Sequence, residues 1–320
     1  MATKFIIFRY NPDEETKPRH QEYMLDIPDG ATLLDCINLI KWTQDGTLSF
    51  RMSCRSAICG SCAMKVNGHA RLTCKTQAVT VVEDGTVKID PLGNFEIIKD
   101  LIVDMEPFWS SLENIEPWLV PDESIIPERE RLMTHEDQKK IDAASTCILC
   151  AACFSDCNVL EVDKKFFGPA TLAKAQRFVY DTRDCKTDVR LERLSDLNGM
   201  WDCTTCAECS TRCPTEAKPL SRIRELKEMG MKRGFRNNHG ARHVLAFRES
   251  IGTRIGGGYL NENYIPARSV GFFNIGGLLS LLPIGVRMFM RGKNPPLLPH
   301  LIEKFGEVKK MFGRFGDYLK

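Results

Sequence analysis

Residues 54–62 read Cys-Arg-Ser-Ala-Ile-Cys-Gly-Ser-Cys, and a further cysteine follows at position 74. Cys54, Cys59, Cys62 and Cys74 therefore have the spacing C-x4-C-x2-C-x11-C. Three thiolates on one tight loop and a fourth on the following strand can surround a two-iron rhomb, and C-x4-C-x2-C is the plant-type [2Fe–2S] spacing. Structural zinc, the alternative, usually shows two separated C-x2-C pairs. The spacing predicts a [2Fe–2S] cluster on these four residues.

The segments before this loop have the patterns of two strands and a helix. Residues 4–10 and 22–27 alternate as strands do and are joined by a polar connection, which predicts a hairpin. From 32 to 42 the apolar residues recur at helical spacing, and Thr32 with Asp35 has the pattern of an N-cap pair. We expect one amphipathic helix to cover a sheet.

After the loop, residues 78–82 and 86–89 flank an Asp-Gly turn, which predicts a second hairpin. Two strands, a helix, a cysteine loop and further strands are typical of a β-grasp ferredoxin domain. We therefore expect an α+β protein whose first domain, residues 1–107, is a β-grasp [2Fe–2S] ferredoxin domain.

Two later cysteine runs share the spacing C-x2-C-x2-C-x3-C. The runs are Cys147, Cys150, Cys153 and Cys157, then Cys203, Cys206, Cys209 and Cys213. In two-cluster ferredoxins the fourth cysteine of each run binds the other cluster. The predicted ligand sets are Cys147, Cys150, Cys153 and Cys213 for a [4Fe–4S] cluster, and Cys157, Cys203, Cys206 and Cys209 for a third cluster.

Helical patterns beside these runs begin at Thr134, Pro169 and Leu220, which predicts an all-α two-cluster domain over residues 133–234. Prolines among acidic residues predict a linker over 108–132. The cysteines stop after Gly234, and we expect residues 235–320 to be a helical extension that docks on a partner or a membrane.

Composition and charge narrow the class of protein further. Fourteen cysteines in a chain whose first ten residues form a strand pattern, without a secretory signal, predict a cytoplasmic protein with metal or redox chemistry. A net charge of +2 gives no general attraction to nucleic acid. No apolar run reaches the roughly 20 residues that a membrane-spanning helix needs. Cys36 and Cys185 fall outside the three sets, and Cys36 is expected to be a small buried hydrophobe.

The combination resembles the iron–sulfur subunit of succinate dehydrogenase and fumarate reductase over about residues 4–232. Two stretches of sequence support the resemblance: Cys-Arg-Ser-Ala-Ile-Cys-Gly-Ser-Cys-Ala-Met-Lys-Val-Asn-Gly at 54–68 and Phe-Gly-Pro-Ala at 167–170. The resemblance implies that electrons pass from the FAD of a separate flavoprotein subunit through three clusters to a quinone-reactive, membrane-associated partner, or back towards fumarate. It places the chain peripherally on the cytoplasmic face of the membrane.

Cys206 is the first departure from that family. Familiar members lack this cysteine and carry a [3Fe–4S] cluster at the third position, so its presence favours [4Fe–4S] over [3Fe–4S] there. Because potential follows cluster type and charge, we expect a lower potential.

The surroundings of the third set also depart from the family. Asn158 stands in place of the usual proline, residues 158–165 lack the paired tryptophans of the family's quinone pocket, and Thr204 replaces a histidine of some relatives. These changes predict that electrons leave through a docked partner rather than through a quinone pocket on this chain.

The extension is the third departure. Residues 270–290 and 291–299 look similar to the C-terminal part of heterodisulfide-reductase-type iron–sulfur subunits, whose partners carry cysteine-rich CCG repeats. Such features fit the non-classical succinate dehydrogenases. A helical face over residues 302–315 is flanked by basic residues, and two interpretations stay open: it lies on a membrane or partner, or it packs on its own protein.

We therefore expect an electron-transfer subunit with no catalytic residues of its own, because no nucleophile–base pair or phosphate loop stands out. The alternative is the iron–sulfur subunit of a thiol:fumarate or heterodisulfide-type reductase. A freestanding soluble polyferredoxin is a third possibility, against which the apolar extension argues, since an uncovered apolar surface favours aggregation.

Overall fold

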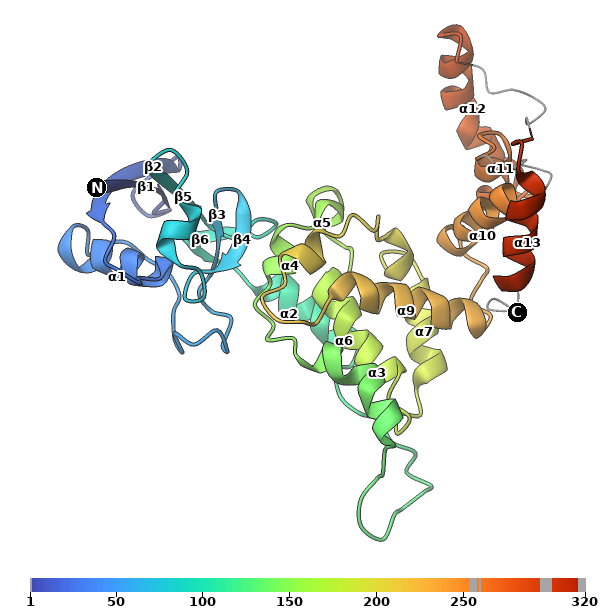
Figure 1. Ribbon diagram of the computed structural model, residues 1–320, viewed down its shortest axis with the longest axis horizontal. Coiled ribbons are helices and arrows are strands. Elements are labelled where there is room, and N and C mark those ends of the chain that lie inside the picture. Colours follow the sequence, from blue (N-terminus) through green and yellow to red (C-terminus); the bar gives the residue numbers. More distant parts are fainter. Residues whose placement is uncertain (1, 254–257, 259, 294–300, 316–320) are drawn as a thin grey trace. The chain divides into compact units, whose positions relative to one another are not determined.

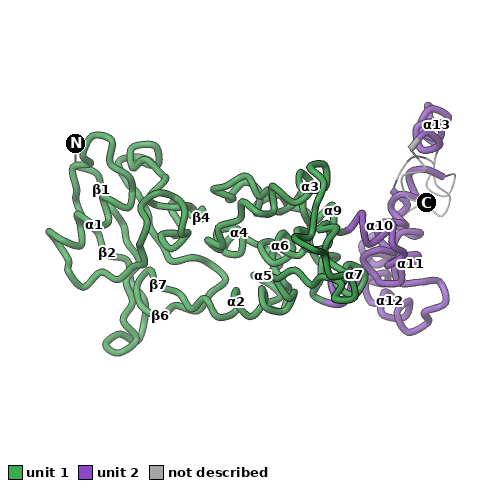
Figure 2. Tube along the Cα trace, turned by 90° about the horizontal axis from the view of Figure 1, so that it is seen from below, with its two compact units in different colours: residues 1–190, 198–226 green, residues 191–197, 227–320 purple. Residues whose placement is uncertain are grey.

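The computed structural model describes residues 2–253, 258, 260–293 and 301–315. The chain divides into two compact units, residues 1–190 with 198–226 and residues 191–197 with 227–320 (Figure 2). In the first unit a sheet domain precedes a set of helices, and the second unit is helical (Figure 1). The predicted α+β fold, with a sheet domain followed by a helical domain, is confirmed.

The sheet has five strands in the order β2-β1-β5-β3-β4. Their bounds are β1 (Ala2–Arg9), β2 (Arg19–Asp26), β3 (Ala63–Val66), β4 (His69–Leu72) and β5 (Thr86–Asp90). β1 pairs antiparallel with β2, as predicted for the first hairpin, and parallel with β5. β3 pairs antiparallel with both β4 and β5. This mixed sheet places the cysteine loop directly before β3.

Helix α1 (Leu33–Thr43) packs on this sheet as predicted. The side chain of Thr32 accepts a hydrogen bond from the Asp35 N–H, and the Asp35 carboxylate accepts one from the Thr32 N–H. Alternate residues of β1, including Phe5 and Ile7, are buried against the helix residue Ile37 and its neighbours. The predicted capping pair and amphipathic pattern are therefore confirmed.

The predicted second hairpin is confirmed at its turn and wrong in its first strand. Glu83 and Thr86 form an antiparallel bridge in which each N–H donates to the other residue's carbonyl at 2.9 Å, and Asp84 (φ 48°) and Gly85 (φ 72°) lie between them. Residues Ala78–Val81 form a 3₁₀ turn, η1, in which Ala78 and Val81 are buried three positions apart. A hairpin of two full strands lies between β3 and β4, around Asn67 (φ 49°) and Gly68 (φ 81°). Positive φ at both central residues is the requirement of a type I′ turn, and Asn-Gly is its preferred sequence. That dipeptide was the signal that sequence reasoning overlooked.

Arg9 continues the buried face of β1 into a polar network. It donates hydrogen bonds to the Asp100 carboxylate at 2.9 Å, the Tyr23 hydroxyl at 2.7 Å and the Thr47 hydroxyl at 2.8 Å, and it pairs with Asp45. The Tyr23 hydroxyl also donates to Asp45 at 2.7 Å. This network ties the sheet to the chain segments on either side of the cysteine loop.

Short helices dominate the chain between the five-stranded sheet and residue 232, and residues 191–195 and 227–232 of these helices belong to the second unit. The elements after the five-stranded sheet are β6 (Ile97–Lys99), β7 (Ile102–Val103), α2 (Glu106–Glu113), α3 (His135–Ser145), α4 (Ala152–Ser155), α5 (Asn158–Val162), α6 (Pro169–Val179), α7 (Thr187–Ser195), η2 (Met200–Asp202), α8 (Glu208–Thr211) and α9 (Pro219–Lys232). Thr134 caps α3, Pro169 opens α6, and α9 begins one residue before Leu220, so the three predicted helices are confirmed.

The predicted linker over 108–132 needs a correction at its start. Helix α2 begins at Glu106, Phe108 is fully buried, and the Ser111 hydroxyl donates to the Phe167 carbonyl at 2.6 Å. Phe108 also meets Phe154 of α4 edge to face. The apolar residues of α2 share one helical face, so this part of the segment packs on the helical domain.

The second unit contains α10 (His239–Gly252), α11 (Tyr264–Val270), α12 (Ile275–Met290) and α13 (Phe305–Phe315). In α13 the half-buried residues Phe305, Val308 and Phe312 form one face. A Cβ atom at Gly252 would lie 2.7 Å from the Phe312 ring, so this face packs on α10. Of the two interpretations of this helix, the structure favours packing on its own protein.

Helix α12 is different, because none of its residues is buried. None of the described helices is both long and apolar enough to cross a membrane. Residues 294–299 of the predicted heterodisulfide-reductase-like segment and the side chain of Phe315 lie outside the described residues.

Replacing Arg9 with methionine should lower the free energy of unfolding of the sheet domain by about 3–5 kcal/mol, because the buried carboxylate of Asp100 and the partly buried carboxylate of Asp45 lose their charged partner. The measurement is the urea midpoint of unfolding followed by circular dichroism. Lys4→Met, on the same strand, removes an exposed pair with Glu22 and serves as the control, with an expected cost below about 1 kcal/mol. Equal effects of the two changes would contradict the role of the network.

Burial alone raises the pKa of Asp45, but hydrogen bonds from Thr47, Tyr23 and Arg9 outweigh it and hold that pKa well below its usual value. A depressed folded-state pKa contributes stability above the unfolded value of about 3.9, and this contribution is lost as the pH falls through the folded pKa. Asp45→Asn should therefore lower stability at neutral pH and flatten its decline below about pH 4. Urea titrations at several pH values measure this, and parallel profiles would contradict it.

Candidate metal centres

The first cysteine set is gathered by main-chain hydrogen bonds to sulfur. The N–H groups of residues 56, 58 and 59 donate to the Cys54 sulfur at 3.3–3.4 Å. The Ala57 N–H donates to the Cys74 sulfur at 3.3 Å, and Cys62 lies beside Cys74. The loop and Cys74 are thus brought together as the spacing predicts, although Cys74 lies two residues beyond the end of β4 rather than on a strand.

The backbone of this loop alternates into the left-handed region. Arg55 has φ 54°, Ala57 has φ 57° and Gly60 has φ 72°. A residue with a Cβ atom loses about 1–2 kcal/mol in this conformation. Successive N–H groups in such alternating backbone form a concave site for an anion. The donor set and this backbone fit a negatively charged iron–sulfur cluster.

The thiols of the first set differ in their acidity. The Ser61 hydroxyl, 3.1 Å from the Cys59 sulfur, and the Cys54 N–H lower the pKa of Cys59 to about 6. Burial and the neighbouring Cys62 thiol raise the pKa of Cys74 to about 11. Hydrogen bonds therefore favour the thiolate form of Cys59, whereas burial opposes it at Cys74.

The two later runs are interleaved in space. Cys213, the last residue of the second run, lies beside Cys147 and Cys150 of the first run. Cys157, the last residue of the first run, lies beside Cys203 and Cys206. The groups that the structure brings together are therefore the two crossed sets of the sequence prediction.

Three of these thiols, Cys153, Cys157 and Cys209, are buried, whereas Cys206 is exposed and the other four are half-buried. Burial and the neighbouring thiols raise the pKa of Cys153 well above its usual value, and the same causes raise the pKa of Cys209 to about 12. Cys153 also has Cys209 among its electrostatic neighbours, so the two crossed groups adjoin each other. Several adjacent thiolates can form here only when a cation compensates their charge.

No three His, Cys, Asp or Glu side chains of the described residues are grouped to hold a single metal ion. In a [4Fe–4S] cluster each thiolate binds a different iron atom, and in a [2Fe–2S] cluster each iron binds two thiolates, so three sulfurs need not converge on one point.

The two runs repeat one backbone design. Leu149 (φ 56°) and Ala151 (φ 59°) flank Cys150, and Thr205 (φ 59°) and Ala207 (φ 72°) flank Cys206 in the same way. Each run then enters a four-residue helix, α4 or α8, that contains the third cysteine. Cys206 is therefore presented by the same local conformation as Cys150.

Asn158 contacts both neighbours that sequence analysis found unusual. Its side-chain oxygen accepts a hydrogen bond from the Thr204 hydroxyl at 3.3 Å and lies 3.7 Å from the Cys206 sulfur. The three departures from the family pattern around the third group are thus in mutual contact.

The sheet domain supplies a cap for helix α4. The Asn94 amide donates to the carbonyls of Phe154 at 2.9 Å, Ser155 at 3.1 Å and Cys157 at 3.0 Å. Carbonyls at a helix C-terminus lack partners within the helix, so this side chain satisfies groups that would otherwise be left open. Sequence reasoning missed Asn94, because no motif marks a cap supplied by another domain.

The two remaining cysteines lie apart from these groups. Cys36 is fully buried in the core of the sheet domain, where burial raises its thiol pKa to about 11. Cys185 is exposed, and its N–H donates to the Val120 carbonyl at 2.8 Å.

Comparison with protein families matches two parts of the chain. Residues 4–110 match the 2Fe-2S iron-sulfur cluster binding domain, and residues 143–217 match the 4Fe-4S dicluster domain. Both matches contain the cysteine groups described above.

Two curated relatives cover most of their own length. A fumarate reductase iron-sulfur subunit of Mycobacterium tuberculosis is 38% identical over 222 residues, 69% of this chain and 90% of that protein. An 8-methylmenaquinol:fumarate reductase iron-sulfur subunit of Wolinella succinogenes is 34% identical over 299 residues, 92% of this chain and 91% of that protein. The Wolinella succinogenes alignment leaves fewer residues of this chain uncovered than there are residues after Gly234. The alignment therefore includes part of residues 235–320.

Among solved structures, a chain of the Mycobacterium smegmatis Sdh1 complex in the apo form superposes with a TM-score of 0.65 and 28% identity. The superposition covers 73% of this chain and 97% of that chain.

Asn94→Gly should destabilise the helical domain by about 1–3 kcal/mol, since three buried carbonyls lose their donor. Glycine tolerates the positive φ of 67° at this position, so backbone strain does not enter. Asn94→Asp should cost more, because a carboxylate would face the three carbonyl oxygens. Urea midpoints for release of iron measure both changes, and a neutral Asn94→Asp variant would refute the capping role.

Proposed function

This chain belongs to the iron–sulfur subunits of fumarate reductases and succinate dehydrogenases, and on this premise we propose that it relays electrons between a FAD-containing flavoprotein and a quinone-reactive partner through three iron–sulfur clusters. The observation that carries the proposal is the succession of three neighbouring cysteine groups, each with main-chain geometry suited to an anionic cluster. Substrate chemistry belongs to the flavoprotein, and this chain contributes no catalytic residue.

We assign the ligands residue by residue. Cys54, Cys59, Cys62 and Cys74 bind the [2Fe–2S] cluster; Cys147, Cys150, Cys153 and Cys213 bind a [4Fe–4S] cluster; Cys157, Cys203, Cys206 and Cys209 bind the third. When bound, each cluster takes up and releases one electron at a time. The chain positions the clusters, excludes water from the buried thiolates and supplies N–H groups that tune their potentials.

For the third cluster we propose [4Fe–4S]. Cys206 has the same flanking conformation as Cys150, whose set matches an ordinary four-iron site. A fourth thiolate holds the iron corner that is otherwise readily lost, which supports a complete cubane over [3Fe–4S].

For the electron exit we propose a quinone-reactive partner with CCG repeats that docks on residues 235–320 at the cytoplasmic face of a membrane. The Wolinella succinogenes relative, whose alignment reaches into this extension, is named for a quinol reductant. Its name supports a quinone-linked function over a thiol-linked one. The exposed apolar residues of α12 supply a surface for such a partner.

Cys206→Ser should convert the third cluster to a three-iron form, because one corner iron loses its thiolate. Electron paramagnetic resonance of the oxidised, native complex should then show an intense [3Fe–4S] signal that the unaltered complex lacks. Cys185→Ser, at the exposed cysteine outside the groups, is the matched control and should leave the spectrum unchanged. An intense [3Fe–4S] signal from the unaltered complex at full iron occupancy would remove Cys206 from the ligand set.

Purification of the native complex tests the broader proposal. The chain should be recovered with a flavoprotein that carries FAD, and reduced samples should contain one two-iron and two four-iron clusters. Recovery of a stable chain without any flavoprotein would favour a freestanding electron carrier.

A further inference from the structure

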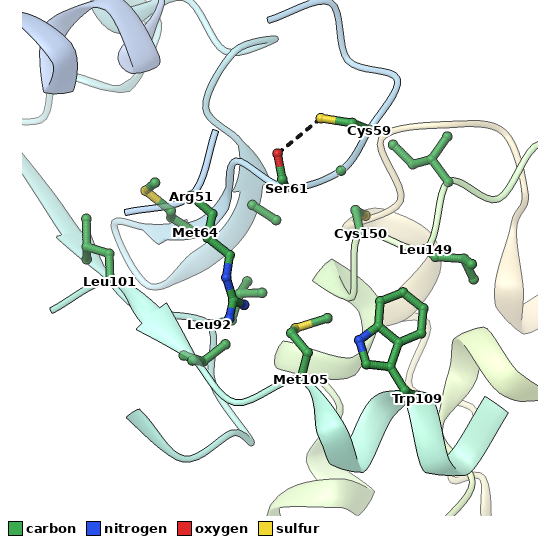
Figure 3. Close-up of a pocket in the computed structure, with 14 residues that line it drawn as sticks. Arg51, Cys59, Ser61, Met64, Leu92, Leu101, Met105, Trp109, Leu149 and Cys150 are labelled. Atoms are coloured by element: carbon green, nitrogen blue, oxygen red, sulfur yellow. Dashed lines mark hydrogen bonds between the residues drawn. The ribbon is translucent and has the colours of Figure 1, made fainter. Parts of the chain in front are cut away.

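The loop of the first cysteine group meets the second group beside a cavity of 430 Å³ (Figure 3). Cys59 and Ser61 lie on the wall contributed by the sheet domain, while Leu149 and Cys150 lie on the opposite wall. Trp109 of α2 closes another side of the cavity. The loop of the first cysteine group and the loop around Cys150 are therefore in direct contact at one place, and the cavity lies next to this contact.

Gly60 is the point of contact. A Cβ atom at this residue would lie 2.8 Å from both Cα and Cβ of Cys150 and 3.2 Å from its nitrogen. Two of these three atoms belong to the main chain, which cannot move aside as a flexible side chain could. The two cluster loops approach this closely only because residue 60 has no side chain.

The N–H groups that contact sulfur in this loop come from residues 54 and 56–59. The side of Gly60 on which a Cβ atom would stand faces Cys150 of the helical domain. Sequence analysis offers no reason for such a contact, because the two residues are distant along the chain.

A second glycine fixes the same domain interface. The Gly93 N–H donates to the Ser155 hydroxyl at 2.9 Å, and a Cβ atom there would lie 2.9 Å from the Ser155 carbonyl oxygen. The Asn94 amide bonds hold the end of α4 next to it. The separation of Cys59 from Cys150 is thus set at two places.

We propose that Gly60 is a positioning residue for electron transfer between the first and second clusters, an inference that rests on the proposed function. One electron leaves the reduced two-iron site, which is oxidised, and arrives at the four-iron site, which is reduced; the flavoprotein or dithionite supplies it. Tunnelling rates fall exponentially with distance and fall faster across empty space than through packed atoms. A side chain at position 60 would push the two loops apart. The distance between the two sites would then increase, and so would the empty space next to the contact.

The test compares Gly60→Ala with Gly30→Ala in the native complex. Gly30 has φ 71°, against 72° for Gly60, but nothing lies within 4 Å of a Cβ atom there, so it carries the same backbone cost without the contact. Pulsed electron paramagnetic resonance of the dithionite-reduced complex measures the magnetic interaction between the two clusters. This interaction should weaken and turnover should slow severalfold in Gly60→Ala, whereas Gly30→Ala should match the unaltered complex.

The g values of each cluster should stay unchanged in both variants, because no ligand is altered. Gly60→Ala with all clusters present and an unaltered interaction would overturn the proposal. If Gly60→Ala loses the first cluster, the same measurement on Gly93→Ala tests the proposal. Gly93 contacts Ser155 at the same interface between the sheet domain and the helical domain, but lies outside the cysteine loop. A weaker interaction in Gly93→Ala supports the proposal, and an unchanged one overturns it. Missing cluster signals in the unaltered complex would instead refute the proposed function.

Discussion

The burial of adjacent cysteine thiols is the constraint on which the helical domain depends. Raised thiol pKa values at Cys153 and Cys209 mean that this interior disfavours the charged form, although iron binds only thiolates. Metal binding and folding are therefore coupled, since the metal supplies the charge that makes the thiolates tolerable. The residues on either side of Cys150 and Cys206 are not glycines, yet they adopt the left-handed conformation. The free-energy cost of this conformation is offset when the N–H groups that it orients face a negatively charged cluster.

The short helix α4 connects this constraint to the sheet domain. It contains Cys153, follows Cys150 and precedes Cys157, so any displacement of α4 alters both later groups. Asn94 caps it, and Gly60 and Gly93 allow the sheet domain to press against its two ends. Lys75 adds a hydrogen bond to the Pro214 carbonyl at 2.7 Å, next to Cys213. The sheet domain thus forms part of the wall around the second cysteine group, and the two ferredoxin modules act as one structural unit.

The departures from the family pattern are concentrated at the third group. Asn158 contacts both Thr204 and Cys206, so the altered residues around this group lie together in space. In the extension, one helix packs on its own unit and another leaves its apolar residues exposed. Helix α13 packs its apolar face on α10, whereas α12 leaves Phe289, Ile275 and other apolar residues exposed. Exposed apolar side chains on this scale are typical of an interaction surface.

The sequence by itself predicted the cysteine groups that the structure brings together, the capped helix α1, the helix that Thr134 caps and the helix that Pro169 opens, because these features depend on residues a few positions apart. It also anticipated the crossed grouping of Cys157 and Cys213, since the spacing of each run follows the geometry of a cubane. Only the tertiary structure decided that residues 78–81 form a turn, that Phe108 starts a packed helix, and that Asn94 and Gly60 serve the neighbouring domain. These outcomes depend on which distant segment covers a residue, and local sequence does not encode that partner.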